Sequence, residues 1–106
     1  MTMRHLTLIC MAGISTSLLV NKMKRLIRNE NLEIAVTAMS ERAFQGYTGQ
    51  TDVLLLGPQL GHRFESLKEQ YESKGIHIDR IDPEHFGAMA VLEQAFPDLS
   101  GQIGDK

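Results

Sequence analysis

The sequence predicts a single α/β domain whose four-stranded parallel sheet is flanked by helices. Short apolar runs alternate with segments of helical periodicity along the chain, and this alternation is typical of a parallel sheet covered on both faces. The run over 52–57 is apolar at its centre, as expected for a central strand. The 106 residues are enough for one domain with one hydrophobic core, which we expect to span about residues 4–96.

The first half of the chain contains two predicted strands and one long helix. Residues 6–10 have the length and apolar character of a strand. The small and polar residues over 11–17 favour a loop. From residue 17 onward the apolar residues recur at helical spacing, which predicts an amphipathic helix that ends over 29–31. Alternating apolar residues over 32–38 predict a second strand.

The second half repeats this order of elements. Ser40 favours the N-cap of a short helix before the central strand. An apolar face over 64–71 predicts a third helix, which Gly75 ends. A fourth strand is expected over 76–81 and a last helix over 86–96. The glycine-rich polar tail that follows is expected to fray.

Composition excludes several classes of protein. The net charge of -2 disfavours a nucleic-acid binder, which usually carries a basic excess. No apolar run approaches the roughly 20 residues of a membrane span, and no signal-peptide pattern is present. The single cysteine fits a reducing compartment, so we expect a cytoplasmic protein. The four histidines lack metal-ligand spacing, and we expect neither a metal nor a cofactor.

Cys10 is the candidate catalytic residue. It closes the first predicted strand, and the carboxyl ends of parallel strands form the edge where such sheets bind ligands. The loop after it can turn its backbone N–H groups inward as an anion site, which the helix N-terminus strengthens. The same groups favour a thiolate nucleophile. The predicted phosphate-binding residues are Met11, Ala12, Gly13, Ile14, Ser15, Thr16 and Ser17. The alternative is an inert buried cysteine beside a hydroxyl-capped helix.

Cysteine phosphatases place Cys-x5-Arg at an equivalent strand–loop–helix position, but this chain has Thr16 where they have arginine. That arginine stabilises the transition state through two parallel hydrogen bonds. A thiolate without it can still accept a phosphoryl group, whereas hydrolysis of the phosphocysteine loses its main electrostatic help. This difference favours a carrier that holds its phosphate until an acceptor arrives.

The segment Leu8-Ile9-Cys10-Met11-Ala12-Gly13-Ile14-Ser15-Thr16-Ser17-Leu18-Leu19-Val20 resembles the signature of phosphotransferase-system B components of the lactose/cellobiose class. The segment from Asp52 to Gln59 is similar to the third strand of that family and its Pro-Gln end. The resemblance covers roughly residues 4–96. It implies a fold similar to low-molecular-weight tyrosine phosphatases and a transient phosphocysteine at Cys10. Gln59 would line the site.

The resemblance also implies the partners. The A component would donate the phosphoryl group from a histidine, and the membrane-embedded C component would hold the sugar that accepts it, at the inner face of the membrane. We expect a monomer that meets these two in turn. The chain departs from the family after the fourth strand, where Asp82-Pro83-Glu84-His85-Phe86-Gly87 has phenylalanine at a position that is commonly tyrosine.

Other residues carry alternative interpretations. Asp82 could act as a general acid in a phosphatase or cap a turn before Pro83. His62 and Arg63 could face the donor's phosphohistidine or lie in a solvated helix start. A basic cluster on the first helix could dock an acidic partner or be solvated: Lys22, Lys24, Arg25 and Arg28. Besides a carrier, a small cysteine phosphatase or arsenate reductase and a regulatory domain of the same fold remain open.

Overall fold

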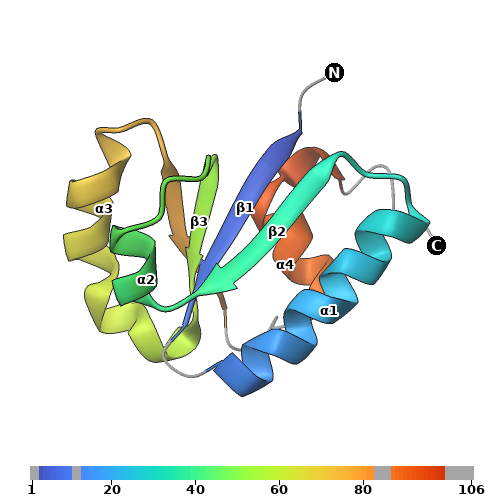
Figure 1. The fold of residues 1–106 in the computed structure, drawn as a ribbon, viewed down its shortest axis with the longest axis horizontal. Helices are drawn as coiled ribbons and strands as arrows, with labels where there is room; N and C mark the ends of the chain where they lie inside the picture. Colours follow the sequence, from blue (N-terminus) through green and yellow to red (C-terminus); the bar gives the residue numbers. More distant parts are fainter. Residues whose placement is uncertain (1–2, 11–12, 83–86, 100–106) are drawn as a thin grey trace.

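The computed structural model describes residues 3–10, 13–82 and 87–99 (Figure 1). Strands and helices alternate along the whole of this length. The strands are β1 Arg4–Ile9, β2 Ile34–Met39, β3 Val53–Leu56 and β4 His77–Arg80. The helices are α1 Gly13–Asn29, α2 Glu41–Gln45, α3 Phe64–Glu72 and α4 Ala88–Ala95, with 3-10 segments η1 Pro58–Arg63 and η3 Pro97–Leu99.

The four strands form one parallel sheet in the order β2-β1-β3-β4. Leu6 of β1 aligns with Val36 on one side and with Val53 on the other. Leu54 of β3 aligns with Ile78 of β4. The predicted fold class, with four parallel strands flanked by helices, is therefore confirmed.

Helices cover both faces of the sheet, with α1 and α4 on one face and α2 and α3 on the other (Figure 1). Because side chains alternate along a strand, β3 sends Leu55 into the first core and Leu54 into the second. Both of these leucines are fully buried. This two-sided burial explains why β3 is the most uniformly apolar strand of the sequence.

Local signals at two helix ends act as predicted. The Ser40 hydroxyl accepts a hydrogen bond from the Ala43 N–H at 3.1 Å and caps α2. Gly75 follows α3 with a φ of 87°, a left-handed conformation that suits glycine. Ser40 therefore marks where β2 gives way to α2, and Gly75 marks where α3 ends before β4.

Two expectations about local structure were wrong. Helix α1 begins at Gly13 rather than at Ser17, so the loop predicted over 11–17 is much shorter. Serine and threonine cost a helix little and no proline interrupts this stretch, so a hydroxyl-rich segment can be helical. The 3-10 segment η1 was not predicted either, because Pro58 indicated only a break in the chain.

The tail is not frayed at its start, in contrast to the prediction. Leu99 is only 1% exposed and packs in the first core with Phe96. The Arg4 guanidinium binds the Asp98 carboxylate at 2.9 Å and lies 4.3 Å from the centroid of the Phe96 ring. These contacts join the beginning of β1 to η3, while residues 100–106 lie outside the described part of the chain.

Candidate active site

Cys10 is the first residue beyond β1 and is held by the sheet on both sides. Its N–H donates to the Met39 carbonyl of β2 at 3.2 Å. The Gly57 N–H, just beyond β3, donates to the Ile9 carbonyl at 2.8 Å. The ladder hydrogen bonds therefore continue to the carboxyl edge and fix the backbone of Cys10 between two neighbouring strand ends.

The thiol is free and Cys10 as a whole is only 7% exposed. Because it directly follows β1, this largely buried residue lies at the carboxyl edge of the sheet.

The predicted phosphate-binding residues fall into two groups. The first turns of α1 contain five of them: Gly13, Ile14, Ser15, Thr16 and Ser17. The structure describes the backbone of these five but not their side chains, and Met11 and Ala12 lie outside the described residues. The first N–H groups of a helix have no partner within it and carry a positive partial charge. No acidic residue lies in the first turn of α1. The structure thus puts an anion-favouring helix end three residues after Cys10.

Gln59 and Asp82 also follow strands at the carboxyl edge, but at different distances from Cys10. Gln59 lies in η1, directly after β3, which is the neighbour of β1. Asp82 is exposed and follows Ile81, whose N–H donates to the Leu56 carbonyl at 2.8 Å. Strands are about 4.8 Å apart, so Asp82 is roughly 10 Å from the Cys10 strand. The segment 83–86, with Phe86, lies outside the described residues.

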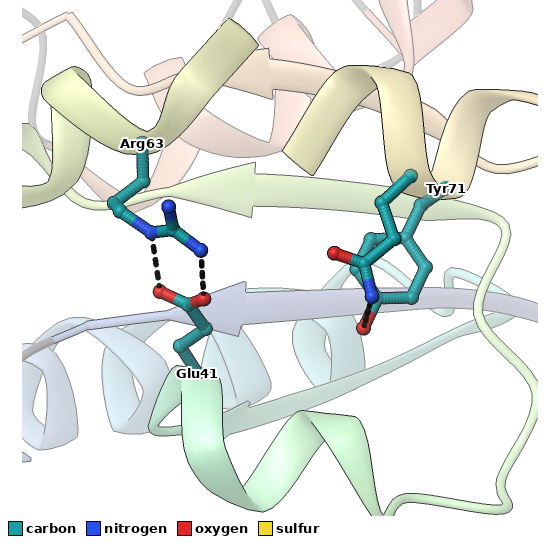
Figure 2. A network of polar contacts seen from close by, with 4 residues as sticks. Glu41, Arg63 and Tyr71 are labelled. Carbon is teal, nitrogen blue, oxygen red and sulfur yellow. Dashed lines mark hydrogen bonds and ion pairs between the residues drawn. The ribbon is translucent and has the colours of Figure 1, made fainter. Parts of the chain in front are cut away.

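Sequence reasoning missed an ion pair beside this edge, between Arg63 and Glu41 (Figure 2). The guanidinium donates from Nε to Oε1 at 3.1 Å and from one terminal nitrogen to Oε2 at 2.6 Å. These bonds hold the pKa of Glu41 below its ordinary value, with a smaller contribution from nearby His62. No sequence signal pairs residues 22 positions apart. His62 itself is exposed, whereas Arg63 is committed to Glu41.

The opposite, amino edge of the sheet has a hollow of about 480 Å³ that the sequence did not indicate. Phe44 and Tyr71 form its buried floor, with their ring centroids 5.1 Å apart. Lys74 and Tyr47 lie on its rim.

Among residues 3–10, 13–82 and 87–99, no group of His, Cys, Asp and Glu could hold a metal ion. Within the same residues, no helix is long and apolar enough to cross a bilayer.

Comparison with known proteins gives consistent matches. A family model described as "PTS system, Lactose/Cellobiose specific IIB subunit" matches residues 6–96. The oligo-beta-mannoside-specific EIIB component of Bacillus subtilis is 29% identical over 85 residues, which cover 80% of this chain and 82% of that protein. The cellobiose-specific EIIB component of Lactococcus lactis is 33% identical over 89 residues, which cover 79% and 82%.

Two solved structures share the fold. The cellobiose-specific phosphotransferase IIB component of Borrelia burgdorferi superposes with a TM-score of 0.74 at 27% identity, over 95% of each chain. The lactose-specific IIB component domain of Streptococcus pneumoniae superposes with a TM-score of 0.76 over 96% of this chain and 99% of that one. At 14% identity, the second match supports the fold alone.

Proposed function

Because the chain belongs to the lactose/cellobiose-specific IIB subunits of the sugar phosphotransferase system, we propose that Cys10 is its phosphoryl carrier. Members of this family are phosphotransferases that work with an A and a C component in sugar uptake. The observation that carries the proposal is the position of Cys10. This single cysteine directly follows β1 at the carboxyl edge, three residues before the first residue of α1.

The first transfer moves a phosphoryl group from a histidine of the A component to Cys10. The sulfur attacks phosphorus, an S–P bond forms, and the N–P bond breaks with its electron pair left on the imidazole nitrogen. The thiol proton ends on that nitrogen. The transferred group carries its charge on three equatorial oxygens, which the N–H groups over residues 13–16, having no partner within α1, are suited to bind.

The second transfer moves the group to a sugar held by the C component at the inner face of the membrane. A sugar hydroxyl oxygen attacks phosphorus, the S–P bond breaks, and the hydroxyl proton restores the thiol. Because Cys10 lies at the carboxyl edge, the same edge meets both partners and must release the first before it meets the second. We expect a monomer whose encounters with each partner are weak.

The sugar is a β-linked disaccharide or short oligosaccharide in this proposal, such as cellobiose, lactose or chitobiose. The relatives are described as specific for oligo-beta-mannosides, cellobiose and galactose. Nothing in the site of this chain distinguishes among these sugars, since the C component binds the substrate.

Phosphorylation by a cognate A component, followed by intact-protein mass spectrometry, tests the proposal. The wild-type chain should gain one phosphoryl group, and Cys10→Ser should gain none while keeping the fold, which circular dichroism checks. Ser40→Ala is a matched control because it alters a hydroxyl at the end of the neighbouring strand β2. Phosphorylation of Cys10→Ser would contradict the carrier, and phosphorylation without onward transfer would favour the regulatory alternative.

A further inference from the structure

The sheet also has two lateral edges, formed by its outermost strands β2 and β4, and these are built differently. Strand β4 has four residues, and His77, Asp79 and Arg80 give it charge or polarity. Strand β2 at the other edge has six residues, Ile34–Met39, without a charged side chain or a proline. Soluble proteins usually protect a sheet edge by short length, charge, proline or a bulge. The β4 edge is protected in this way and the β2 edge is not.

The register shows which backbone groups of β2 face outward. The Arg4 N–H donates to the Glu33 carbonyl at 3.0 Å, and the Cys10 N–H donates to the Met39 carbonyl at 3.2 Å. In a parallel pair alternate residues bond to the neighbour, so odd-numbered residues of β2 face β1. Ile34, Val36 and Ala38 therefore direct their N–H and C=O groups away from the sheet. No strand pairs with that side in the part of the chain that the structure describes.

A groove of about 310 Å³ runs between this edge and α1. Val36, Thr37 and Ala38 form one wall. The other wall comes from α1, where Lys24 is the charged residue, beside Val20 and Asn21. Lys24 is exposed and lines the groove opposite Val36, Thr37 and Ala38, so its charge lies beside this strand.

The helix beside the groove concentrates positive charge. Helix α1 contains Lys22, Lys24, Arg25 and Arg28 and no acidic residue. The other 89 residues contain seven Lys or Arg against thirteen Asp or Glu, from totals of 11 and 13. Among the described residues, none of the four cations forms an ion pair. Arg28 follows Lys24 by one helical turn, so it lies on the same side of α1.

We infer that the β2 edge accepts an extended acidic segment of another protein as a fifth strand. Outward N–H and C=O groups of Val36 and Ala38 would pair with the backbone of that segment, and Lys24 with its carboxylates. The inference goes beyond the proposed function, since this lateral edge is separate from the carboxyl edge at Cys10.

A second copy of this chain is a poorer occupant. Antiparallel pairing of two β2 strands would put Lys24 of both copies beside the same two-fold axis. Like charges at an interface are unfavourable, and each copy would bring its row of unpaired cations to the other. An acidic segment instead supplies the counter-charge that α1 lacks.

A synthetic ten-residue peptide of alternating glutamate and valine, blocked at both ends, is the probe. Amide hydrogen exchange followed by NMR should show new protection at Val36 and Ala38 and no change in β4. Ala38→Pro removes one outward N–H without removing a ladder bond and should abolish this protection. Lys24→Glu should weaken binding about tenfold. Lys22→Glu is the matched control, because it makes the same charge change outside the groove, and should weaken binding less.

Three results would overturn the inference: no protection at Val36 and Ala38 with the acidic peptide, equal protection with the matching lysine–valine peptide, or a dimer of the free chain that Ala38→Pro dissociates. The same variants should be phosphorylated at Cys10 as well as wild type by the A component. Failure of the peptide experiment with normal phosphorylation would leave the carrier function standing. The reverse pattern would leave the edge site standing.

Discussion

The carboxylate of Glu41 and the guanidinium of Arg63 form a two-pronged ion pair that joins the helix after β2 to the segment after β3. Both elements flank Cys10, since β2 and β3 are the two neighbours of β1. Two parallel hydrogen bonds fix the relative orientation of the groups as well as their distance. The pair therefore joins the two elements on either side of Cys10 at the carboxyl edge.

Glu41→Gln should lower the melting temperature at pH 7 by about 1–4 °C, because the partly exposed pair contributes modestly to stability. The hydrogen bond from Arg63 lowers the pKa of Glu41 in the folded chain from 4.5. The ion pair therefore contributes fully to the stability of the fold above pH 4.5, the ordinary pKa of glutamate. This contribution is lost as the pH falls through the lowered pKa of Glu41. Thermal unfolding of both proteins against pH should show converging melting temperatures in acid. A constant difference down to strong acid would contradict this account.

Leu54→Ala should destabilise the domain by about 3–5 kcal/mol, because Leu54 is 0% exposed in the centre of the sheet and its removal leaves a cavity. Urea unfolding measures this loss. Leu18→Ala makes the same chemical change on α1, where Leu18 is 63% exposed, and should change stability by less than about 0.5 kcal/mol. Similar losses at the two positions would show that the burial pattern is wrong.

The hydroxyl pair of Thr7 and Thr51 should respond unequally to substitution. The two oxygens are 2.9 Å apart, Thr7 is 1% exposed, and Thr51 is only partly buried. Thr51→Val leaves the Thr7 hydroxyl buried without this partner and should cost about 1–3 kcal/mol. Thr7→Val leaves a hydroxyl that water can reach and should cost less. Chemical denaturation of the two single variants and the double variant measures these losses in the free energy of unfolding. A larger loss for Thr7→Val than for Thr51→Val would refute the argument.

Gly75→Ala should cost about 1–2 kcal/mol, although no atom beyond its two chain neighbours lies within 4 Å of the added methyl group. The cost comes from the φ of 87°, which a side chain disfavours. Gly46→Ala is the matched control, because Gly46 follows α2 with a φ of -100° and its methyl group would meet the Ala43 carbonyl at an ordinary 4.0 Å. This second change should be near neutral. Equal losses in a calorimetric scan would argue against the conformational cause.

The wild-type chain should show negligible turnover of an aryl phosphate, and its phosphocysteine should persist long enough for intact-protein mass spectrometry. N–H groups at a helix end hold the phosphoryl oxygens in both ground and transition states, so they favour binding more than hydrolysis. Loss of a donor that acts mainly in the transition state typically costs about 10²–10³ in rate, and Thr16 stands where phosphatases have such an arginine. Turnover that disappears in Cys10→Ser would promote the phosphatase interpretation.

Periodicity and end signals predicted the arrangement of the fold because they are local. The apolar centre of β3, the Ser40 cap and the Gly75 stop each depend on a few adjacent residues. The start of α1 was misjudged because Ser and Thr are compatible with both a loop and a first helical turn. The Glu41–Arg63 pair could not be predicted, because it forms only when the sheet brings two strand ends together.

The position of Cys10 was predictable from strand and helix order, but its burial was not. A lone cysteine at a strand end can be reactive or inert, and its 7% exposure depends on tertiary packing that no short stretch of sequence specifies. The different placement of Gln59 and Asp82 depends on the strand order β2-β1-β3-β4, which the sequence does not specify.

The contact of Arg4 with Asp98 brings the two ends of the described domain together at the amino edge of the sheet. Cys10 lies at the other end of the six-residue strand β1, about 20 Å away. A neighbouring domain joined by a linker at either end would therefore be tethered without covering the carboxyl edge, where Cys10 lies. If the flexible linker just spans the distance to Cys10, the tethered domain would be present there at an effective concentration of about millimolar. Weak encounters between carrier and partner would then suffice for rapid transfer.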